Sequence, residues 1–323
     1  MSHLLLIGIL GAVIGSFLSM LVYRLPRIMQ RQWRSECQEF LGVEDGAEGE
    51  KKESLWLPRS HCPHCSHPLR LVDNIPVIGF LLNRGHCNHC NHPIGWRYLT
   101  IELLAIAVAI TATLHFDQPL HASAAMGFGW ILLALLFIDL EHQLLPDPLT
   151  QILLWSGLLV NQWDLFAAPS EALWGAVAGY LALWMVFHLY RLVTGCSGMG
   201  GGDLKLFAAL GAWCGWLLLP QILLIASLSG IVVGIPFILS KRKKGEPGGI
   251  ARNSVTPIWA VTPIPFGPFL ALGGWIALLW GGEINRLAGD LLDTIRLAGD
   301  LLDANQLLGI TGLQPFGAIG GIG

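Results

Sequence analysis

Two aspartates of this 323-residue chain stand where long apolar stretches end or begin. Asp139 ends one such stretch, and Asp203 begins another, directly after the glycine-rich run Gly198-Met-Gly-Gly-Gly202. Two carboxylates brought close together cannot both ionise easily, so one keeps a proton while the other acts as a base on a shared water. That is the chemistry of aspartic peptide hydrolysis, and the glycines would let the backbone approach a substrate strand. Asp139 and Asp203 are therefore our candidate catalytic pair.

The neighbourhood of Asp139 offers an alternative acid. Asp147 stands between two prolines and could replace Asp139 in the pair, if it does not simply shape the turn. Glu141 and His142 fit a solvated loop. Either candidate aspartate could instead be an ordinary interfacial carboxylate, such as a helix cap. The residues alone leave these alternatives open.

Other hydrolytic motifs are incomplete. Gly195-Cys-Ser197-Gly198 imitates the GxSG of intramembrane serine peptidases, but those enzymes pair the serine with a histidine on a later span, and no histidine follows His188. The chain has no HExxH metalloprotease motif and no phosphate loop ending in Gly-Lys-Ser/Thr. Aspartate chemistry is the hydrolytic mechanism that the sequence favours.

Four of the seven cysteines form two pairs, Cys62-Pro-His-Cys65 and Cys87-Asn-His-Cys90. Each pair can present two thiolates to one side of a tetrahedral ion, as in a structural zinc ribbon. Four protein ligands leave no open coordination position, so we expect Cys62, Cys65, Cys87 and Cys90 to hold a structural zinc ion. The alternatives are that a histidine of the flanking repeats replaces one cysteine, or that the four are free or redox-active thiols.

The other three cysteines have no partner by spacing. Cys37, Cys196 and Cys214 fit free thiols that serve as small apolar residues.

The composition places these candidate sites in a membrane protein. Hydrophobic residues make up 53% of the chain and charged residues 13%, whereas soluble proteins carry about 25% charged residues. The mean hydropathy is +0.58, and the 13 Trp and 39 Gly suit transmembrane helices and their interfaces. A water-soluble enzyme and a nucleic-acid binder are thereby disfavoured.

A spanning helix needs about 20 mostly apolar residues, and eight stretches approach this length. We expect an all-α polytopic fold of about eight transmembrane helices. The predicted spans are Leu4–Tyr23, Tyr98–Phe116, Ala124–Leu140, Leu149–Leu165, Ala172–Val193, Leu204–Leu219, Gln221–Leu239 and Ile264–Gly281.

The positive charges predict the orientation of these spans. No Lys or Arg precedes the first span, while Arg24, Arg27, Arg31 and Arg34 follow it, which is the opposite of a secretory signal. The positive-inside rule then puts the N-terminus outside and the next loop in the cytoplasm. Because two spans separate Asp139 from Asp203, both aspartates are expected at the cytoplasmic face. Disulfides are disfavoured in the cytoplasm, which strengthens the metal interpretation of the cysteines.

The chain is therefore expected to have four parts: a first transmembrane helix (1–23), a cytoplasmic zinc-binding loop (24–97), a transmembrane aspartic peptidase domain (98–281) and a C-terminal tail (282–323). The tail contains a tandem repeat, Arg286–Asp293 and Arg296–Asp303. The repeat suits either a short amphipathic interfacial helix or a neutral duplication.

Residues 5–281 resemble the bacterial type IV prepilin peptidases, which are GxGD-type intramembrane aspartic peptidases that also serve type II secretion. The resemblance is carried by several short motifs besides the two Cys-x-x-Cys pairs. These motifs are Gly15-Ser-Phe-Leu18, Tyr23-Arg-Leu-Pro26, Asp73-Asn-Ile-Pro76, Arg97-Tyr98 with Glu102-Leu103, Ile138-Asp139 to Leu-Leu-Pro-Asp147, Gly200–Asp203 with Lys205, and Pro265-Phe-Gly-Pro268.

The resemblance implies a function and a location. Members of the family cut the short basic leader from type IV prepilin or pseudopilin precursors at the cytoplasmic face of the inner membrane, after a glycine. The family's two aspartates fall on Asp139 and Asp203. Many members also methylate the new N-terminal amine with S-adenosylmethionine, and a zinc module is typical of these bifunctional enzymes. We expect membrane lipid as a further partner and no nucleic acid, and the residues that bind S-adenosylmethionine stay unassigned.

Three alternatives to a bifunctional peptidase remain from the sequence. The protein could be a peptidase without methyltransferase activity, since Leu99 stands where the family usually has proline, and His61 and His86 stand where arginine is common. It could be a transporter with a zinc-stabilised cytoplasmic loop, although transporter carboxylates usually lie near the bilayer midplane. It could also be a non-catalytic scaffold for pilus assembly, in which case the aspartates would be dispensable.

Overall fold

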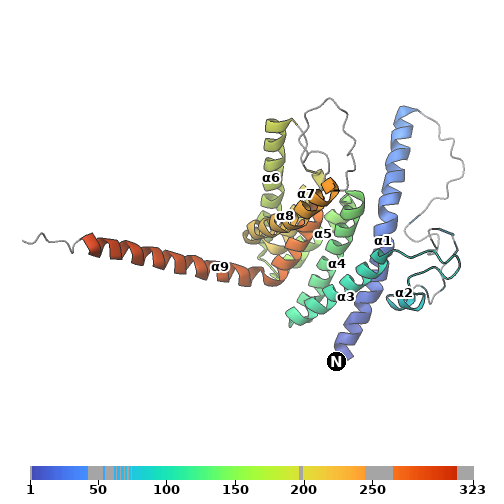
Figure 1. Cartoon of the computed structure of the whole chain (residues 1–323), viewed down its shortest axis with the longest axis horizontal. Coiled ribbons are helices and arrows are strands. Elements are labelled where there is room, and N and C mark those ends of the chain that lie inside the picture. The colour runs from blue at the N-terminus through green and yellow to red at the C-terminus, as the bar shows by residue number, and fades with distance from the viewer. Residues whose placement is uncertain are drawn as a thin grey trace, which may run out of the picture. The chain divides into compact units, whose positions relative to one another are not determined.

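The computed structural model (Figure 1) is helical, and no β-strand occurs in the ranges that it describes. Together with the long apolar helices, this confirms the predicted all-α polytopic class. His61, Cys196 and the chain after Ile310 lie outside the described residues. The described residues are 2–42, 54, 62, 64–65, 67–68, 70, 73, 75–195, 199–243 and 265–310.

Figure 1 labels the helices of the chain in order. Two short 3₁₀ helices, Asn161–Trp163 and Trp216–Leu218, follow α5 and α7. The chain divides into two compact units, residues 1–279 and 280–323, and α9 contains the boundary between them. The helices are α1 (Ser2–Leu41), α2 (Ile78–Leu82), α3 (Trp96–His115), α4 (Pro119–His142), α5 (Asp147–Val160), α6 (Pro169–Thr194), α7 (Gly201–Cys214), α8 (Leu219–Lys243) and α9 (Gly267–Ile310).

Six segments are long and apolar enough to cross a membrane. The other two predicted spans coincide with α5 and α7, which have 14 residues each. At 1.5 Å per residue they measure about 21 Å, against a hydrocarbon core of about 30 Å. The six long segments are Ser2–Leu41, Trp96–His115, Pro119–His142, Pro169–Thr194, Trp216–Pro236 and Gly267–Asp290.

A buried asparagine sets the length of α5 and α7. Asn161 ends α5, and its Nδ2 donates hydrogen bonds to the carbonyls of Ala212 at 2.8 Å and Trp213 at 3.0 Å, in the last turn of α7. Its Oδ1 accepts hydrogen bonds from the backbone of Phe166 and Ala167. One side chain therefore satisfies two orphan carbonyls of α7 and turns the chain toward α6. The apolar sequence continues past both helix ends, which is why the predicted spans were longer.

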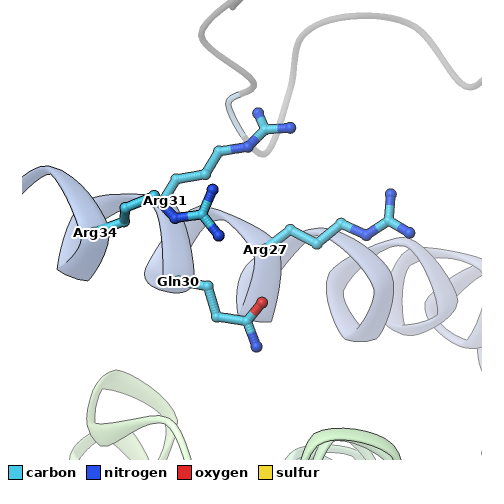
Figure 2. A pocket seen from close by; sticks show the side chains of 4 residues that line it. All are labelled: Arg27, Gln30, Arg31 and Arg34. Atoms are coloured by element: carbon cyan, nitrogen blue, oxygen red, sulfur yellow. The ribbon is translucent and has the colours of Figure 1, made fainter. Parts of the chain in front are cut away.

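The first helix extends beyond its predicted span. We expected a loop after Tyr23, but α1 continues as a helix to Leu41 and carries Pro26 inside it. Beyond Pro26, three arginines leave successive turns of α1 and line, with Gln30, a shallow hollow of about 260 Å³ (Figure 2). Arginine and glutamine are good helix formers, so charge alone does not end the helix where the apolar stretch ends.

Glycines allow two pairs of helices to touch at backbone distance. On α1, a Cβ at Gly15 would lie 2.7 Å from the Cα of Glu102 on α3. Gly11 faces α3 in the same way, one turn earlier, so Gly11 and Gly15 form a GxxxG contact. Between α6 and α7, a Cβ at Gly175 would lie 2.2 Å from the carbonyl oxygen of Gly211. These contacts bring the first helix and α7 into the bundle.

The centre of the first unit is built around α4 and α7. The largest buried side chains of its main core cluster include Phe128 on α4 and Phe207 and Leu210 on α7. The Trp213 indole N–H at the end of α7 donates to the Leu153 carbonyl of α5 at 2.8 Å. The two helices that carry the candidate aspartates are thus the most enclosed ones, which gives the aspartates a rigid support.

Candidate active site and metal centre

Asp139 belongs to the last turn of α4. The helix ends at Gln143, whose backbone is left-handed with φ of 53° and whose N–H donates to the Asp139 carbonyl at 2.9 Å. The Asp139 residue is only 5% exposed. Its Oδ2 accepts a hydrogen bond of 3.1 Å from the backbone N–H of Gly267, the first residue of α9. The helix end therefore directs a buried carboxylate toward the start of another helix.

Gly267 is a site residue to which the sequence assigned no role. A Cβ at this position would lie 2.6 Å from Asp139 Oδ2 and 3.3 Å from Leu145 Cδ2. Only glycine leaves room for the carboxylate to reach the N–H. The one signal in the sequence was its place in the Pro265-Phe-Gly-Pro268 motif.

Asp203 lies in the first turn of α7, after the glycine run. Gly200 is the N-cap residue, and its carbonyl accepts a hydrogen bond from the Asp203 backbone at 3.3 Å. Asp203 is only 6% exposed. A helix N-terminus carries a partial positive charge that favours an acidic side chain in its first turn.

The backbone next to each aspartate's carboxylate approaches Leu145, in the turn between α4 and α5. A Cβ at Gly202 would lie 2.7 Å from Leu145 Cβ, and one at Gly267 would lie 3.3 Å from Leu145 Cδ2. The turn, the start of α7 and the start of α9 therefore converge on one side chain. The structure places Asp139 at the end of α4 and Asp203 at the start of α7, and the backbone beside both faces Leu145.

The neighbouring acids occupy different positions. Asp147 forms an ion pair of 2.6 Å with Lys205, and the side chains of Asp147 and Lys205 are 54% and 44% exposed. Glu141 pairs with Arg97 at the start of α3. Glu141 and His142 are part of α4, so the solvated loop that we expected there is wrong. Asp147 is thus exposed, whereas Asp139 and Asp203 are both buried.

The four predicted cysteines come together. Their sulfur atoms all lie within 4.8 Å of one another, and the cluster could hold a metal ion. The Cys62 and Cys90 sulfurs are 3.8 Å apart, and zinc bonded tetrahedrally to sulfur at about 2.3 Å separates its ligands by roughly 3.8 Å. The cysteines therefore fit a tetrahedral ion. We name the segment Cys62–Pro93 the metal module.

The metal module is built from two equivalent knuckles. The Cys62 N–H donates to the His67 carbonyl and the Cys87 N–H donates to the His92 carbonyl, each at 2.9 Å. The backbone N–H groups of Cys90 and His89 lower the pKa of the Cys87 thiol to about 7. This shift favours the thiolate, which is the form that binds metal.

The imidazoles of the two knuckles stack on one another. The rings of His64 and His92 have centroids 4.3 Å apart, and so do those of His67 and His89. Each stack joins one knuckle to the other. Among the described residues, the group that could hold a metal contains the four cysteines and no histidine.

The fold and the site define a multi-pass helical membrane protein with a buried acid pair at helix ends and a tetracysteine metal module. Comparison with known proteins places it more narrowly. A family model described as the bacterial peptidase A24 N-terminal domain matches residues 9–116, and one described as the type IV leader peptidase family matches residues 126–235. The chain belongs to the type IV leader peptidase family.

Curated relatives are similar over most of their length. A prepilin leader peptidase/N-methyltransferase of Stutzerimonas stutzeri is 45% identical over 85% of this chain and 90% of that protein. Proteins of the same description from Pseudomonas aeruginosa and Burkholderia pseudomallei are each 44% identical, over 86% and 87% of this chain and 90% and 86% of their own lengths. No solved structure matches the chain.

Proposed function

We propose that this protein is a prepilin leader peptidase that uses Asp139 and Asp203 to remove the leader from type IV pilin-like precursors. The observation that carries the proposal is the pair of buried carboxylates at the end of α4 and the start of α7, whose neighbouring backbone converges on Leu145. The relatives are named for this activity. The positive charges that follow the first span support a location of the pair at the cytoplasmic face of the membrane.

The acid pair can hydrolyse a peptide bond by general acid–base chemistry. The ionised carboxylate removes a proton from a water held between the pair, and the water oxygen bonds to the scissile carbonyl carbon. The protonated carboxylate donates its proton to the carbonyl oxygen. When the tetrahedral intermediate collapses, the C–N bond breaks, the leaving nitrogen takes the proton that came from water, and one hydroxyl proton of the intermediate returns to the carboxylate that had protonated the carbonyl oxygen. The Gly267 N–H keeps Asp139 in place throughout this cycle.

The glycines around the pair give the substrate backbone access. Three glycines without side chains stand directly before Asp203, namely Gly200, Gly201 and Gly202. A Cβ at Gly201 would meet open space. A substrate whose apolar segment lies along the membrane helices would present its scissile bond near the C-terminal end of α4 and the N-terminal end of α7. The leader would then stay on the same side as the arginines of α1.

We also infer that the four cysteines hold zinc and that the enzyme methylates the new N-terminus. The donor set of four thiolates is typical of structural zinc. When bound, zinc would fix the two knuckles relative to each other and leave no site for a reacting ligand. The relatives' names include N-methyltransferase, which implies S-adenosylmethionine as methyl donor. The mass of the cleaved product, with or without the increment of one methyl group, tests this activity.

Substitution of the acids tests the proposed peptidase site. In purified protein incubated with a prepilin, Asp139→Asn and Asp203→Asn should each lower the rate of leader removal at least about a thousandfold. Asp147→Asn is the matched control, since it removes an acid of the same region, and it should retain most of the activity. The assignment is wrong if either candidate variant cleaves at the wild-type rate, or if Asp147→Asn alone abolishes cleavage.

A further inference from the structure

An apolar segment separates the two knuckles of the metal module. It runs from Ile75 to Leu82 and contains α2. One side faces inward: Gly79 is buried, and the Phe80 ring lies against the buried Gly85, where an added Cβ would be 3.0 Å from the ring. The other side is exposed. We name the exposed side chains the apolar patch, and they are Ile75, Ile78, Leu81, Leu82 and Trp96, with exposed fractions from 42% to 73%.

A hydrogen bond joins this segment to the membrane helices. The backbone N–H of Val77 donates to Oε2 of Glu102 at 2.8 Å. Glu102 is a buried carboxylate on α3, and its Cα lies against Gly15 of α1. Figure 1 shows α2 beside the stretch where α1 and α3 run together.

Residue positions on α1 and α3 indicate how far this segment extends toward the apolar spans. The Arg97 guanidinium lies over the Tyr23 ring at 5.6 Å, so these residues of α3 and α1 share one level. Charged side chains gather there, including Arg27 and Glu141. Glu102 comes five residues after Arg97, and Gly15 comes eight residues before Tyr23, both in the direction of the apolar spans. At 1.5 Å per residue, and with side chains tilted back along the helix, the Val77 hydrogen bond lies about 5–10 Å inside that level.

The backbone of the segment is suited to surroundings without water. An unpaired N–H in hydrocarbon costs several kcal/mol, and several N–H groups of this segment and of the turn that follows it have acceptors inside the protein. Val77 even takes a left-handed conformation, with φ of 61°, which is rare for a β-branched residue. The N–H groups of Val77, Gly79, Leu81, Asn83, Arg84 and Gly85 each donate to a carbonyl or carboxylate of the chain.

We propose that residues 75–82 form a re-entrant anchor that inserts the apolar patch into the lipid leaflet on the side of the metal module. The depth of about 5–10 Å is the depth at which interfacial helices bury their apolar face. Trp96 lies at the boundary, where tryptophans of membrane proteins concentrate. The occupant of the patch is the bilayer itself, because the patch is apolar and its segment is held inside the level of the charged side chains. The anchor fixes the metal module beside α1 and α3.

Site-specific fluorescence in vesicles tests the anchor without requiring catalytic activity. An environment-sensitive fluorescent amino acid is placed at Leu81 in the full chain, and the protein is reconstituted into phosphatidylethanolamine–phosphatidylglycerol vesicles. The matched control carries the probe at Phe40, an apolar residue on α1 that is 91% exposed and lies beyond the arginines. Quenching is compared between aqueous iodide and lipids with a doxyl group near the headgroup end of the acyl chain.

We expect the probe at 81 to be quenched by the doxyl lipid and to resist iodide severalfold better than the probe at 40. Quenching of both probes by iodide alone would place the patch in water and overturn the proposal. Protection from both quenchers would also overturn it, because a substrate helix or a second copy would then cover the patch. Metal content shows that the labelled module has folded, and a probe at Ile78 repeats the measurement if labelling at 81 reduces that content.

Discussion

Asp139 and Asp203 are supplied by opposite kinds of helix end. Asp139 comes from the last turn of α4, and Asp203 comes from the first turn of α7. A carboxylate at a helix N-terminus gains from the macrodipole, whereas one at a C-terminus does not. The N–H of Gly267 offsets this difference, because it supplies to Asp139 the kind of backbone donor that a helix N-terminus offers. The Gly267 N–H thus makes the surroundings of the Asp139 carboxylate more like those of the Asp203 carboxylate.

We predict that Gly267→Ala impairs peptide hydrolysis while the protein still folds. The added Cβ would lie 2.6 Å from Asp139 Oδ2, so the carboxylate must move. A misplacement of about 1 Å can cost about a hundredfold in rate. Leader removal measured with a prepilin at saturating concentration should therefore fall by about that factor.

Gly127→Ala is the control for this variant, since Gly127 lies on α4 and a Cβ there would meet open space. It should cleave at the wild-type rate. Wild-type cleavage by Gly267→Ala would show that the position of the Asp139 carboxylate does not limit the reaction.

The sequence was sufficient to select the two acids as candidate site residues, but it was not sufficient to predict the role of Gly267. Acidic residues are rare in apolar stretches, so Asp139 and Asp203 stood out, and counting the spans between them put both on one face. Gly267 acts through a contact with a residue 128 positions away in the chain. A glycine has no side-chain chemistry to read, and the approach of α9 to α4 follows from packing of the whole unit. The Val77–Glu102 hydrogen bond escaped prediction for the same reason.

Two helices, α5 and α7, are shorter than their hydropathy suggests. The predicted spans reached Leu165 and Leu219, but α5 ends at Val160 and α7 at Cys214. Gly215, with φ of 78°, ends α7, and Asn161 joins the two helix ends. Hydropathy averages over a window, so one buried amide does not register in it. The polar group is tolerated there because both of its ends are hydrogen-bonded.

Removal of the Asn161 amide should destabilise the bundle. Asn161→Leu would leave two carbonyls and two N–H groups without their partner in a buried place. We expect a loss on the order of 3 kcal/mol, seen as a drop of several degrees in the apparent unfolding temperature of the detergent-solubilised protein. Gln162→Ala, at the exposed neighbouring position, is the control. Equal unfolding temperatures for both variants would contradict the bridging role.

At the scale of the whole molecule, the charged residues and the two candidate sites occupy separate places. Arginines follow the first span, and at the same level Arg97 of α3 forms an ion pair with Glu141 of α4. The metal module lies beside the paired helices α1 and α3, and the acid pair lies between α4, α7 and the start of α9. The two centres thus rest on different helices of the first unit, so damage to one need not destroy the other.

Loss of the metal should therefore affect the module first. We predict about one zinc ion per chain by elemental analysis, and its loss in Cys62→Ser, because three thiolates bind zinc less tightly than four. Cys37→Ser, which removes an exposed free thiol of α1, should keep the metal. A wild-type protein purified without any bound metal would refute the structural zinc.

The C-terminal unit should be dispensable for cleavage. Every element that positions the acids lies within residues 1–279, and the span at the start of α9 is complete at Asp290. Both copies of the repeat are helical, but they follow the residues that hold Asp139. A chain that ends at Asp293 keeps the span and the first copy, and we expect it to remove a prepilin leader at the wild-type rate. A chain that ends at Gly273 interrupts the span and should lose activity. If the chain ending at Asp293 is present in the membrane at the normal level but does not cleave, the second copy of the repeat has a role in the reaction that the acid pair alone does not supply.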